Sequence, residues 1–448
     1  MPPRRRSSSR AHPDASCQPP EKEKNRPCRR RRGRRAPGVG TLPDDVLSAI
    51  FSRVPSGAAG VARCAAACRR WARVVATRAA AIARALPQPR PAGFLPHLAL
   101  GVLHGPQIRG TRTRRKPVVS IAASGGSPSL RLDGGGGLFD SARSPVASRN
   151  GRVVLELRRE DRADGLTLCV CNPMAGPPDD AAVLPALAGN DCPGYYACAM
   201  LTADDLDATV TVAPSFFRVL LVYNRRSFTA LRCYSSDAGS WGPERRKPGA
   251  KMSARTLQQL GPAAVVRGVA YWPATHRAAF GVRLDDGGGT TLLDVCWVPY
   301  RMPDFLPDFR LLGVSPDGER LSYISAGRTL RRYLMITVET LQLQGVEEDT
   351  MMMSTAAGRW DTHAHISLPQ FEVPGATALK LRWFGDKSGT LVFTIGEGGN
   401  TSGAFALNLA TSSVEKLADG VHCNSWTNLC GYEMDRATLL ALVAARFF

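Results

Sequence analysis

The sequence lacks the motifs by which common enzyme classes are recognised. It contains no G-x-x-x-x-G-K-[ST] phosphate loop, no G-x-G-x-x-G fingerprint between a strand and a helix, and no G-x-S-x-G nucleophile elbow. The glycine runs at 134–137 and 285–289 lie among polar residues and predict β-turn loops. No carboxylates are paired with a base, and no cofactor signature is present. The sequence therefore predicts a protein that is not an enzyme and needs no cofactor.

Metal-binding signatures are also scarce. The twelve cysteines are scattered without a C-x-x-C pair, which predicts a reduced, intracellular protein. Cys169 and Cys171 would share one face of a strand and could contact one ion, but buried thiols are the favoured interpretation. His363 and His365 would share a strand face in the same way. We expect ordinary turn or core residues here, and also in a looser group of His422, Cys423 and Cys430.

The chain has no apolar run near the roughly 20 residues of a membrane helix. Its start lacks the apolar core of a secretory signal, so we expect no membrane association. Residues 1–40 are almost free of aliphatic side chains and hold thirteen Lys and Arg against three acids, about half of the net charge of +20. This composition predicts a disordered basic tail.

The densest part of that tail has two interpretations. It is either a nuclear-import signal or nucleic-acid patch, or a solvated basic tail of the kind that disordered segments often carry. Few aromatic residues are interleaved, so base stacking is not indicated. The arginines concerned are Arg29, Arg30, Arg31, Arg32, Arg34 and Arg35.

Residues 41–86 predict a small helical domain. Thr41 and Asp44 resemble a capping pair, and an apolar stripe follows at helical spacing until the Pro-Ser-Gly at 55–57 ends the helix. That stripe consists of Val46, Leu47, Ile50, Phe51 and Val54. A second periodic run contains Val61, Cys64, Cys68, Trp71, Val74 and Val75. Prolines at 87–93 predict a linker.

From residue 94 to 432 short β-rich runs alternate with Gly, Pro, Asp and Asn turns. Successive hairpins start at Gly151, Phe216, Gly268, Gly318 and Gly389, a degenerate repeat of the size of a propeller blade. The favoured architecture is a β-propeller of five to seven irregular blades, and two stacked β-sandwiches are the alternative. Residues 433–448 predict a C-terminal helical segment that packs back onto the β domain. The fold class is thus α+β and multidomain.

The stretch "LPDDVLSAIFSRVP…VARCAAACRRWARVV" resembles an F-box of the plant type. The resemblance implies that the apolar stripe docks on a Skp-type adaptor, with Trp71 as a central anchor. For Phe51, Val54 and Trp71 the alternative is that they fill the domain's own core, since core and anchor residues share one periodicity. The implied adaptor-binding residues are Leu42, Pro43, Val46, Leu47, Ile50, Phe51, Val61, Cys68 and Trp71.

The second helix departs from the F-box pattern, because "SGAAGVARC" contains Gly57 and Gly60 where the family has leucines. We therefore expect the first helix to carry most of the adaptor contact. The β region resembles the F-box-associated β domains of large grass families in "FRVLLVYNRRSFTALRCYSSDAGSWG", "VVRGVAYWPAT", "LLGVSPDGERLSYI" and "LRWFGDKSGTLVFTIG". This likeness implies a propeller-like module that recruits a protein target.

Together these features predict the substrate-recognition subunit of an SCF-type ubiquitin ligase, located in the nucleus, the cytoplasm or both. Its partners would be a Skp-type adaptor, a cullin reached through that adaptor, and an unknown protein substrate. The alternative is a nucleic-acid-binding or nuclear scaffold protein that acts through the basic tail, aided by "RGTRTRRK" at 109–116. A β-propeller enzyme is a third possibility, based on fold alone.

Overall fold

The computed structural model describes only part of the chain, and the statements below concern that part. The described residues are 42–86, 94–95, 98–105, 118–120, 142–157, 165–173, 181–187, 194–206, 213, 215–247, 249–275, 278–283, 292–297, 310–342, 359–372, 379–397 and 401–447. The chain divides into two compact units, 1–43 and 44–448. Of the first unit, only Leu42 and Pro43 are described. No helix in the described segments is long and apolar enough to cross a membrane.

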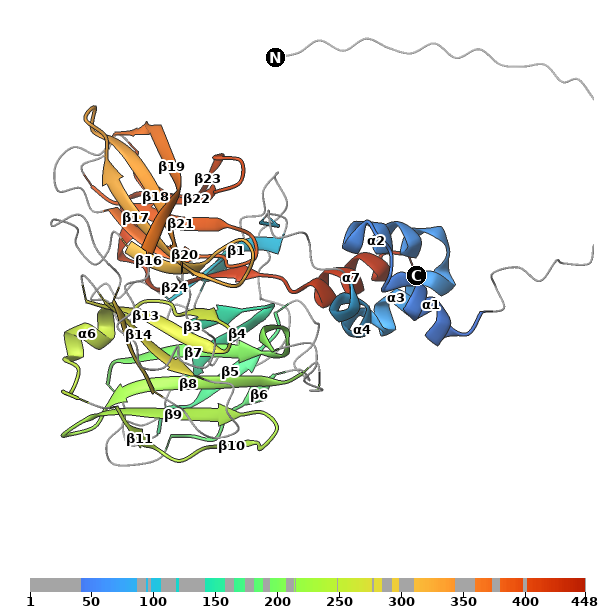
Figure 1. Ribbon diagram of the computed structural model, residues 1–448, viewed down its shortest axis with the longest axis horizontal. Helices are drawn as coiled ribbons and strands as arrows, with labels where there is room; N and C mark the ends of the chain where they lie inside the picture. The colour runs from blue at the N-terminus through green and yellow to red at the C-terminus, as the bar shows by residue number, and fades with distance from the viewer. Residues whose placement is uncertain are drawn as a thin grey trace, which may run out of the picture. The chain divides into compact units, whose positions relative to one another are not determined.

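The second unit begins with four short helices, in the region where the sequence predicts a helical domain with two periodic runs (Figure 1). They are α1 (Asp44–Phe51), α2 (Gly57–Ala67), α3 (Arg69–Thr77) and α4 (Ala79–Ala85). Two aspartates occupy the first turn of α1, where negative charge is favoured by the helix dipole. The second periodic run is divided in two, because Cys68 adopts an extended conformation (φ −162°, ψ 156°) between α2 and α3.

A further helix, α7 (Arg436–Ala445), comes from the far end of the chain. It packs against α2, α3 and α4 (Figure 1), so the expectation that this segment packs on the β domain is wrong for most of its length. Leu440 and Ala444 on its inner side are almost fully buried. We call α1, α2, α3, α4 and α7 the helical module.

The β region forms five antiparallel blades. Blade 1 contains β3 (Ala142–Arg149), β4 (Arg152–Leu157), β5 (Leu168–Cys171) and β6 (Ala182–Val183). Blade 2 contains β7 (Tyr196–Thr202), β8 (Phe217–Asn224), β9 (Thr229–Ser235), β10 (Ser240–Trp241) and β11 (Arg245–Arg246). Blade 3 contains β12 (Ala264–Val266), β13 (Val269–Thr275), β14 (Ala278–Arg283) and β15 (Leu292–Trp297). Blade 4 contains β16 (Arg310–Val314), β17 (Leu321–Arg328), β18 (Tyr333–Gln342) and β19 (Arg359–Glu372). Blade 5 contains β20 (Leu379–Phe384), β21 (Thr390–Ile395), β22 (Gly403–Asn408) and β23 (Val414–Asp419).

A three-stranded sheet closes the ring. It joins β1 (Ala99–Gly105) and β2 (Val118–Ser120) to β24 (Thr427–Glu433), in the order β2-β1-β24. The strand β24 lies beside β20 of blade 5 and β3 of blade 1. Both ends of the β region therefore meet in one closing sheet, and the prediction of a propeller is confirmed, with five complete blades.

Apolar clusters fill the gaps between neighbouring sheets. Between blades 4 and 5, for example, Leu311 and Ile336 pack against Phe393 and Phe405. Fully burying one such side chain contributes about 1.5–3 kcal/mol. The sequence repeat has a structural basis as well, because each expected hairpin start immediately precedes, or lies close before, the second strand of a blade: β4, β8, β13, β17 and β21.

Candidate functional site

The two halves of the predicted F-box motif meet in the helical module. Arg70 of the CRRW sequence forms an ion pair with Asp44 of LPDD at 2.8 Å. Arg78 does the same with Asp45, also at 2.8 Å. These pairs are solvent-exposed and contribute little to stability, and they link the start of α1 to α3 and to Arg78 at the junction of α3 and α4.

An aromatic contact completes this junction. The ring of Trp71 meets Phe51 edge to face, with centroids 5.4 Å apart, a geometry that aromatic pairs favour. The thiol of Cys68 accepts a hydrogen bond from the Trp71 backbone N–H at 3.5 Å and so caps α3. The role of CRRW is therefore structural in three of its four residues.

The apolar stripe of α1 is divided between core and surface. Leu47 and Phe51 are each only 1% exposed, whereas Val46 is 42% and Ile50 is 47% exposed. The latter two stand one helical turn apart, so they form a continuous apolar ridge on the outer side of α1.

The other predicted contact residues divide in the same way. Val61 is fully buried, Trp71 and Leu42 are half-buried, and Pro43 and Cys68 are exposed. The structure thus assigns Leu47, Phe51 and Val61 to the core of the helical module rather than to an open adaptor surface. Val54 lies in the turn after α1 and is half-buried.

Gly60 in α2 has a packing role that the sequence comparison with leucine-rich F-boxes did not suggest. It is buried, and a Cβ at this position would collide with Ser56 Oγ and Val54 Cγ1. A glycine here allows the turn after α1 to close directly onto α2.

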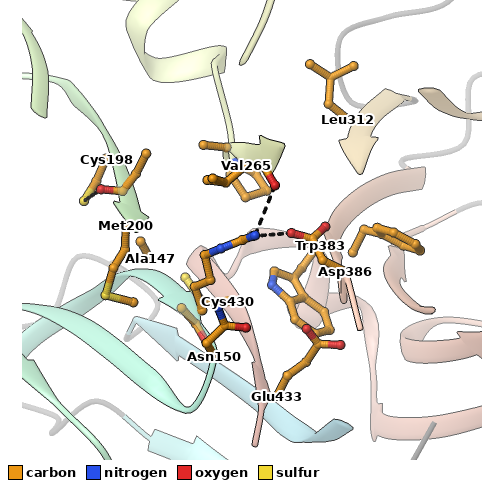
Figure 2. A pocket seen from close by; sticks show the side chains of 16 residues that line it. Ala147, Asn150, Cys198, Met200, Val265, Leu312, Trp383, Asp386, Cys430 and Glu433 are labelled. Atoms are coloured by element: carbon orange, nitrogen blue, oxygen red, sulfur yellow. Dashed lines mark hydrogen bonds and ion pairs between the residues drawn. The ribbon is translucent and has the colours of Figure 1, made fainter. Parts of the chain in front are cut away.

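A second polar assembly lies at one end of the propeller channel (Figure 2). Arg149, the last residue of β3, donates to Asp205 Oδ1 at 2.8 Å and forms an ion pair with Asp386. It also donates to the Val265 carbonyl at 3.1 Å. One guanidinium therefore ties blade 1 to blades 2, 3 and 5. We call Arg149, Asp205 and Asp386 the channel clasp.

Neighbouring residues extend the channel clasp. The Asn150 amide donates to Thr202 Oγ1 at 2.8 Å. Glu433, at the end of β24, accepts from the Ser388 backbone N–H at 2.6 Å, which ties the closing sheet to blade 5. The cavity beside them has a volume of about 40 Å³, enough for only a few water molecules.

The carboxylates of the channel clasp have opposite pKa shifts. Burial opposes ionisation of Asp205, but the charge and hydrogen bonds of Arg149 outweigh it and hold the pKa of Asp205 below its usual value. Burial raises the pKa of Asp386 to about 6, with Arg149 opposing the rise and Glu433 adding to it. Each charged group is engaged by another, so the arrangement is suited to holding blades together rather than to acid–base catalysis.

The candidate metal residues do not form a metal site. No group of three or more His, Cys, Asp or Glu suitable for a metal occurs within the described segments. Cys169 and Cys171 lie buried in the cluster between blade 1 and the closing sheet. His363 and His365 are exposed on β19.

Two other thiols line the channel cavity (Figure 2). Burial raises the pKa of Cys198 well above its usual value and that of Cys430 to about 12. Both are therefore neutral thiols at physiological pH, with little nucleophilic character.

Some predicted features lie outside the described residues. These are the basic tail 1–40 with its arginines at 29–35, Thr41, the proline linker 87–93, the basic stretch 109–116, and the glycine runs at 134–137 and 285–289.

Three solved structures show weak likenesses to this chain. A functionally unknown protein from Desulfotomaculum acetoxidans DSM 771 has a TM-score of 0.31 at 10% identity, covering 65% of this chain and 90% of that one. A structure from a study of two prolyl endopeptidases has a TM-score of 0.32 at 11% identity, and the match covers 62% of this chain and 34% of that one. Kuenenia stuttgartiensis hydrazine synthase has a TM-score of 0.31 at 8% identity, and the match covers 60% of this chain and 65% of that one. Likenesses at these scores carry no argument about this chain.

Family comparisons cover both parts of the chain. Among curated proteins no match to the chain was found. Residues 39–80 match the F-box-like family model, and this range contains α1, α2 and α3. Residues 107–445 match a second model, which extends from the closing sheet through all five blades to the end of α7. Since that match covers most of the sequence, the chain belongs to the family described as Domain of unknown function (DUF7595).

Proposed function

We propose that this protein is the substrate-recognition subunit of an SCF-type ubiquitin ligase. F-box-type proteins are generally non-catalytic adaptors, and F-box domains generally bind Skp-type adaptors. In this proposal the helical module docks on such an adaptor and through it on a cullin. The propeller recruits the protein target. The likeness to the F-box-associated domains of grasses supports the same division of work.

The observation that carries the proposal is the exposed apolar ridge of α1. Val46 and Ile50 remain 42% and 47% exposed, while Leu47 and Phe51 on the other side of the helix are buried in the core of the helical module. Docking would bury these two side chains in a groove of the partner, as helix-in-groove interfaces do. Cys68 is also exposed and would extend the contact.

The test is a binding titration of the full-length protein with a purified Skp-type adaptor. Val46→Asp with Ile50→Asp places two charges on the ridge without disturbing the core, and should weaken binding at least about tenfold, or about 1.4 kcal/mol. The matched control is Ala59→Asp with Ala66→Asp, two exposed positions of α2, which should bind within about twofold of the wild type. Unchanged binding by the ridge variant would remove the basis of the proposal.

Localisation follows as a further part of the proposal. We expect the protein in the nucleus, the cytoplasm or both, with the arginines at 29–35 acting as an import signal. A fluorescent fusion in which these six arginines are replaced by glutamine should shift toward the cytoplasm. An unchanged distribution would assign the tail no role in import.

A further inference from the structure

Blade 2 carries a concentration of positive charge at one end. Residues 224–259 contain eight Lys and Arg against two acids, Asp237 and Glu244. In the β8–β9 pairing, Asn224 lies opposite Thr229 at the hairpin, and β11 returns to the same end, where Lys247 N–H donates to the Thr229 carbonyl at 2.8 Å. Six of the eight cations therefore lie at or near this end: Arg225, Arg226, Arg246, Lys247, Lys251 and Arg255. We call them the basic rim.

The basic rim is held together by specific contacts. Lys251 Nζ donates to the Arg226 carbonyl at 3.0 Å, which joins the loop before α6 (Ala254–Gln259) to the β8–β9 hairpin. The Asn224 amide donates to the Met252 carbonyl at 2.8 Å and strengthens the same junction. The Arg246 guanidinium lies over the Phe228 ring at 5.6 Å. The cations are thus presented from a fixed surface.

Most of this charge is open to a partner. Arg226, Arg246, Lys251 and Arg255 are exposed, and no carboxylate in the described segments forms an ion pair with any of these four. Arg225 differs, because it pairs with Glu244 at 2.7 Å. A run of uncompensated like charges on one surface attracts an oppositely charged partner and raises its association rate.

An exposed aromatic side chain lies at the same end of blade 2. Tyr196 pairs with Tyr223 at the start of β7, so Tyr195 lies one residue further toward the hairpin end that holds Asn224. Its side chain is 52% exposed. Tyrosine is favoured at binding hot spots because its ring adds contact area while its hydroxyl remains hydrated.

We infer that the basic rim and Tyr195 bind an acidic, aromatic- or leucine-containing segment of the protein that the propeller recruits. That the segment belongs to a recruited protein rests on the proposed function, whereas the binding surface itself is independent of it. Carboxylates of the segment pair with the exposed cations, and an apolar side chain packs on Tyr195. A nucleic acid is less well served, because stacking of successive bases needs several aromatic rings. Tyr195 is the one exposed large aromatic side chain in the described part of blade 2, and the Phe228 ring already carries Arg246.

The surface lies away from the channel clasp. The clasp gathers the ends of β3, β7 and β20, whereas the basic rim lies at the opposite end of blade 2, where β7 begins. Variants of the rim therefore leave the residues that join the blades untouched.

The test uses fluorescence anisotropy with a labelled twelve-residue peptide of glutamates that contains one leucine and one tryptophan. The protein is the full chain with the six arginines at 29–35 replaced by glutamine, so that the tail adds little background. Arg226→Glu with Lys251→Glu should weaken peptide binding at least tenfold at about 50 mM salt. Because screening shortens the range of these charges, the difference should shrink at about 500 mM salt.

The control carries the same change of charge elsewhere. Arg331→Glu with Arg332→Glu alters two exposed residues of the β17–β18 hairpin on blade 4 and should bind the peptide within about twofold of the parent. A separate variant, Tyr195→Ala, should weaken the peptide with leucine and tryptophan more than an all-glutamate peptide.

Three results would overturn the inference. The first is an equal loss of peptide affinity in the rim double variant and the control double variant. The second is unchanged peptide affinity in the rim double variant. The third is a duplex DNA probe that binds more tightly than the peptide and displaces it. The adaptor titration with α1 variants is independent of these measurements, so failure of the rim and failure of the proposed function can be told apart. Circular dichroism of each variant establishes that the fold is retained.

Discussion

The helical module and the channel clasp are stabilised in different ways. The module has an apolar core, and its exposed ion pairs join residues 26 and 33 positions apart, Asp44–Arg70 and Asp45–Arg78. The channel clasp is a buried set of charges, in which Arg149 reaches partners 56 and 237 positions away. Helices α1 to α4 of the first region are thus linked within one short stretch of sequence and are joined by α7 from the far end of the chain, whereas closure of a ring brings the second region together.

The end of the chain contributes to both regions. Strand β24 closes the propeller, and α7 then packs within the helical module. The first turn of α7 is fixed to blade 1 through Asn172, which donates to Thr438 Oγ1 at 3.0 Å. Substitutions in the channel clasp should therefore weaken the propeller, and substitutions in α7 should weaken the helical module.

The largest effect is expected from Arg149→Met. The guanidinium is buried, and its loss leaves Asp205 and Asp386 as unpaired charges, which costs about 3–5 kcal/mol. Hydrogen exchange should show faster opening in 142–157 and 196–206, with adaptor affinity almost unchanged. The control Arg267→Met removes a solvent-exposed ion pair with Glu319, and should cost less than about 1 kcal/mol. Equal effects of the two substitutions would contradict the role of the clasp.

Leu440→Ala should produce the reverse pattern. Leu440 is 1% exposed within the helical module, so its truncation leaves a cavity and costs about 2–5 kcal/mol. Exchange should accelerate in 57–85 and adaptor affinity should fall, while the blade 4 segment 310–342 stays protected. Phe447→Ala, at a position 39% exposed beyond α7, is the control with little effect. Unchanged exchange in 57–85 would show that α7 is dispensable for the module.

A smaller effect concerns pH and the clasp alone. The pKa of Asp386 is raised from 3.8 to about 6 in the folded protein. Between these two values the folded state still holds a proton on Asp386, whereas the unfolded state has released it. The stability gained from this proton is present below about pH 4 and is lost as pH rises toward 6. Asp386→Asn keeps an oxygen acceptor for Arg149 and removes this dependence, which is at most about 1.4 kcal/mol per pH unit.

Urea unfolding at pH 4.5, 5.5 and 6.5 measures the difference. The stability of Asp386→Asn relative to the wild type should increase with pH across this range. Asp205, with its lowered pKa, titrates below this range in both proteins and cancels in the comparison. A relative stability that stays constant would place the Asp386 pKa near its ordinary value.

The sequence predicted the local features of this molecule well. The Asp-rich start of α1 and the glycines before second strands reflect contacts or conformations within a few residues. The helix stop predicted at 55–57 was placed too late, because α1 ends at Phe51 and Gly57 already begins α2. The division at Cys68 was missed because α2 and α3 continue one apolar periodicity across it. The division of α1 into core and surface was also out of reach, since periodicity places Leu47 and Ile50 on the same side.

The channel clasp depends on positions that only the closed ring brings together. Strand β3, "ARSPVASR", which ends in Arg149, contains a proline and several polar residues and has no strand-like alternation of apolar and polar side chains. One local signal does exist: Asn150 and Gly151 both have positive φ, 46° and 76°, as an Asn-Gly hairpin turn requires. That dipeptide places Arg149 at the end of a blade, but its partners in blades 2 and 5 carry no comparable signal.

Hydrogen exchange of the full-length protein with and without a purified Skp-type adaptor tests the central claim most directly. The account predicts that the adaptor slows exchange in 42–51, where Val46 and Ile50 form the exposed ridge, and around residue 68. It predicts no change in 224–259 of blade 2. The absence of a complex, or protection confined to the propeller while α1 exchanges as in the free protein, would contradict it.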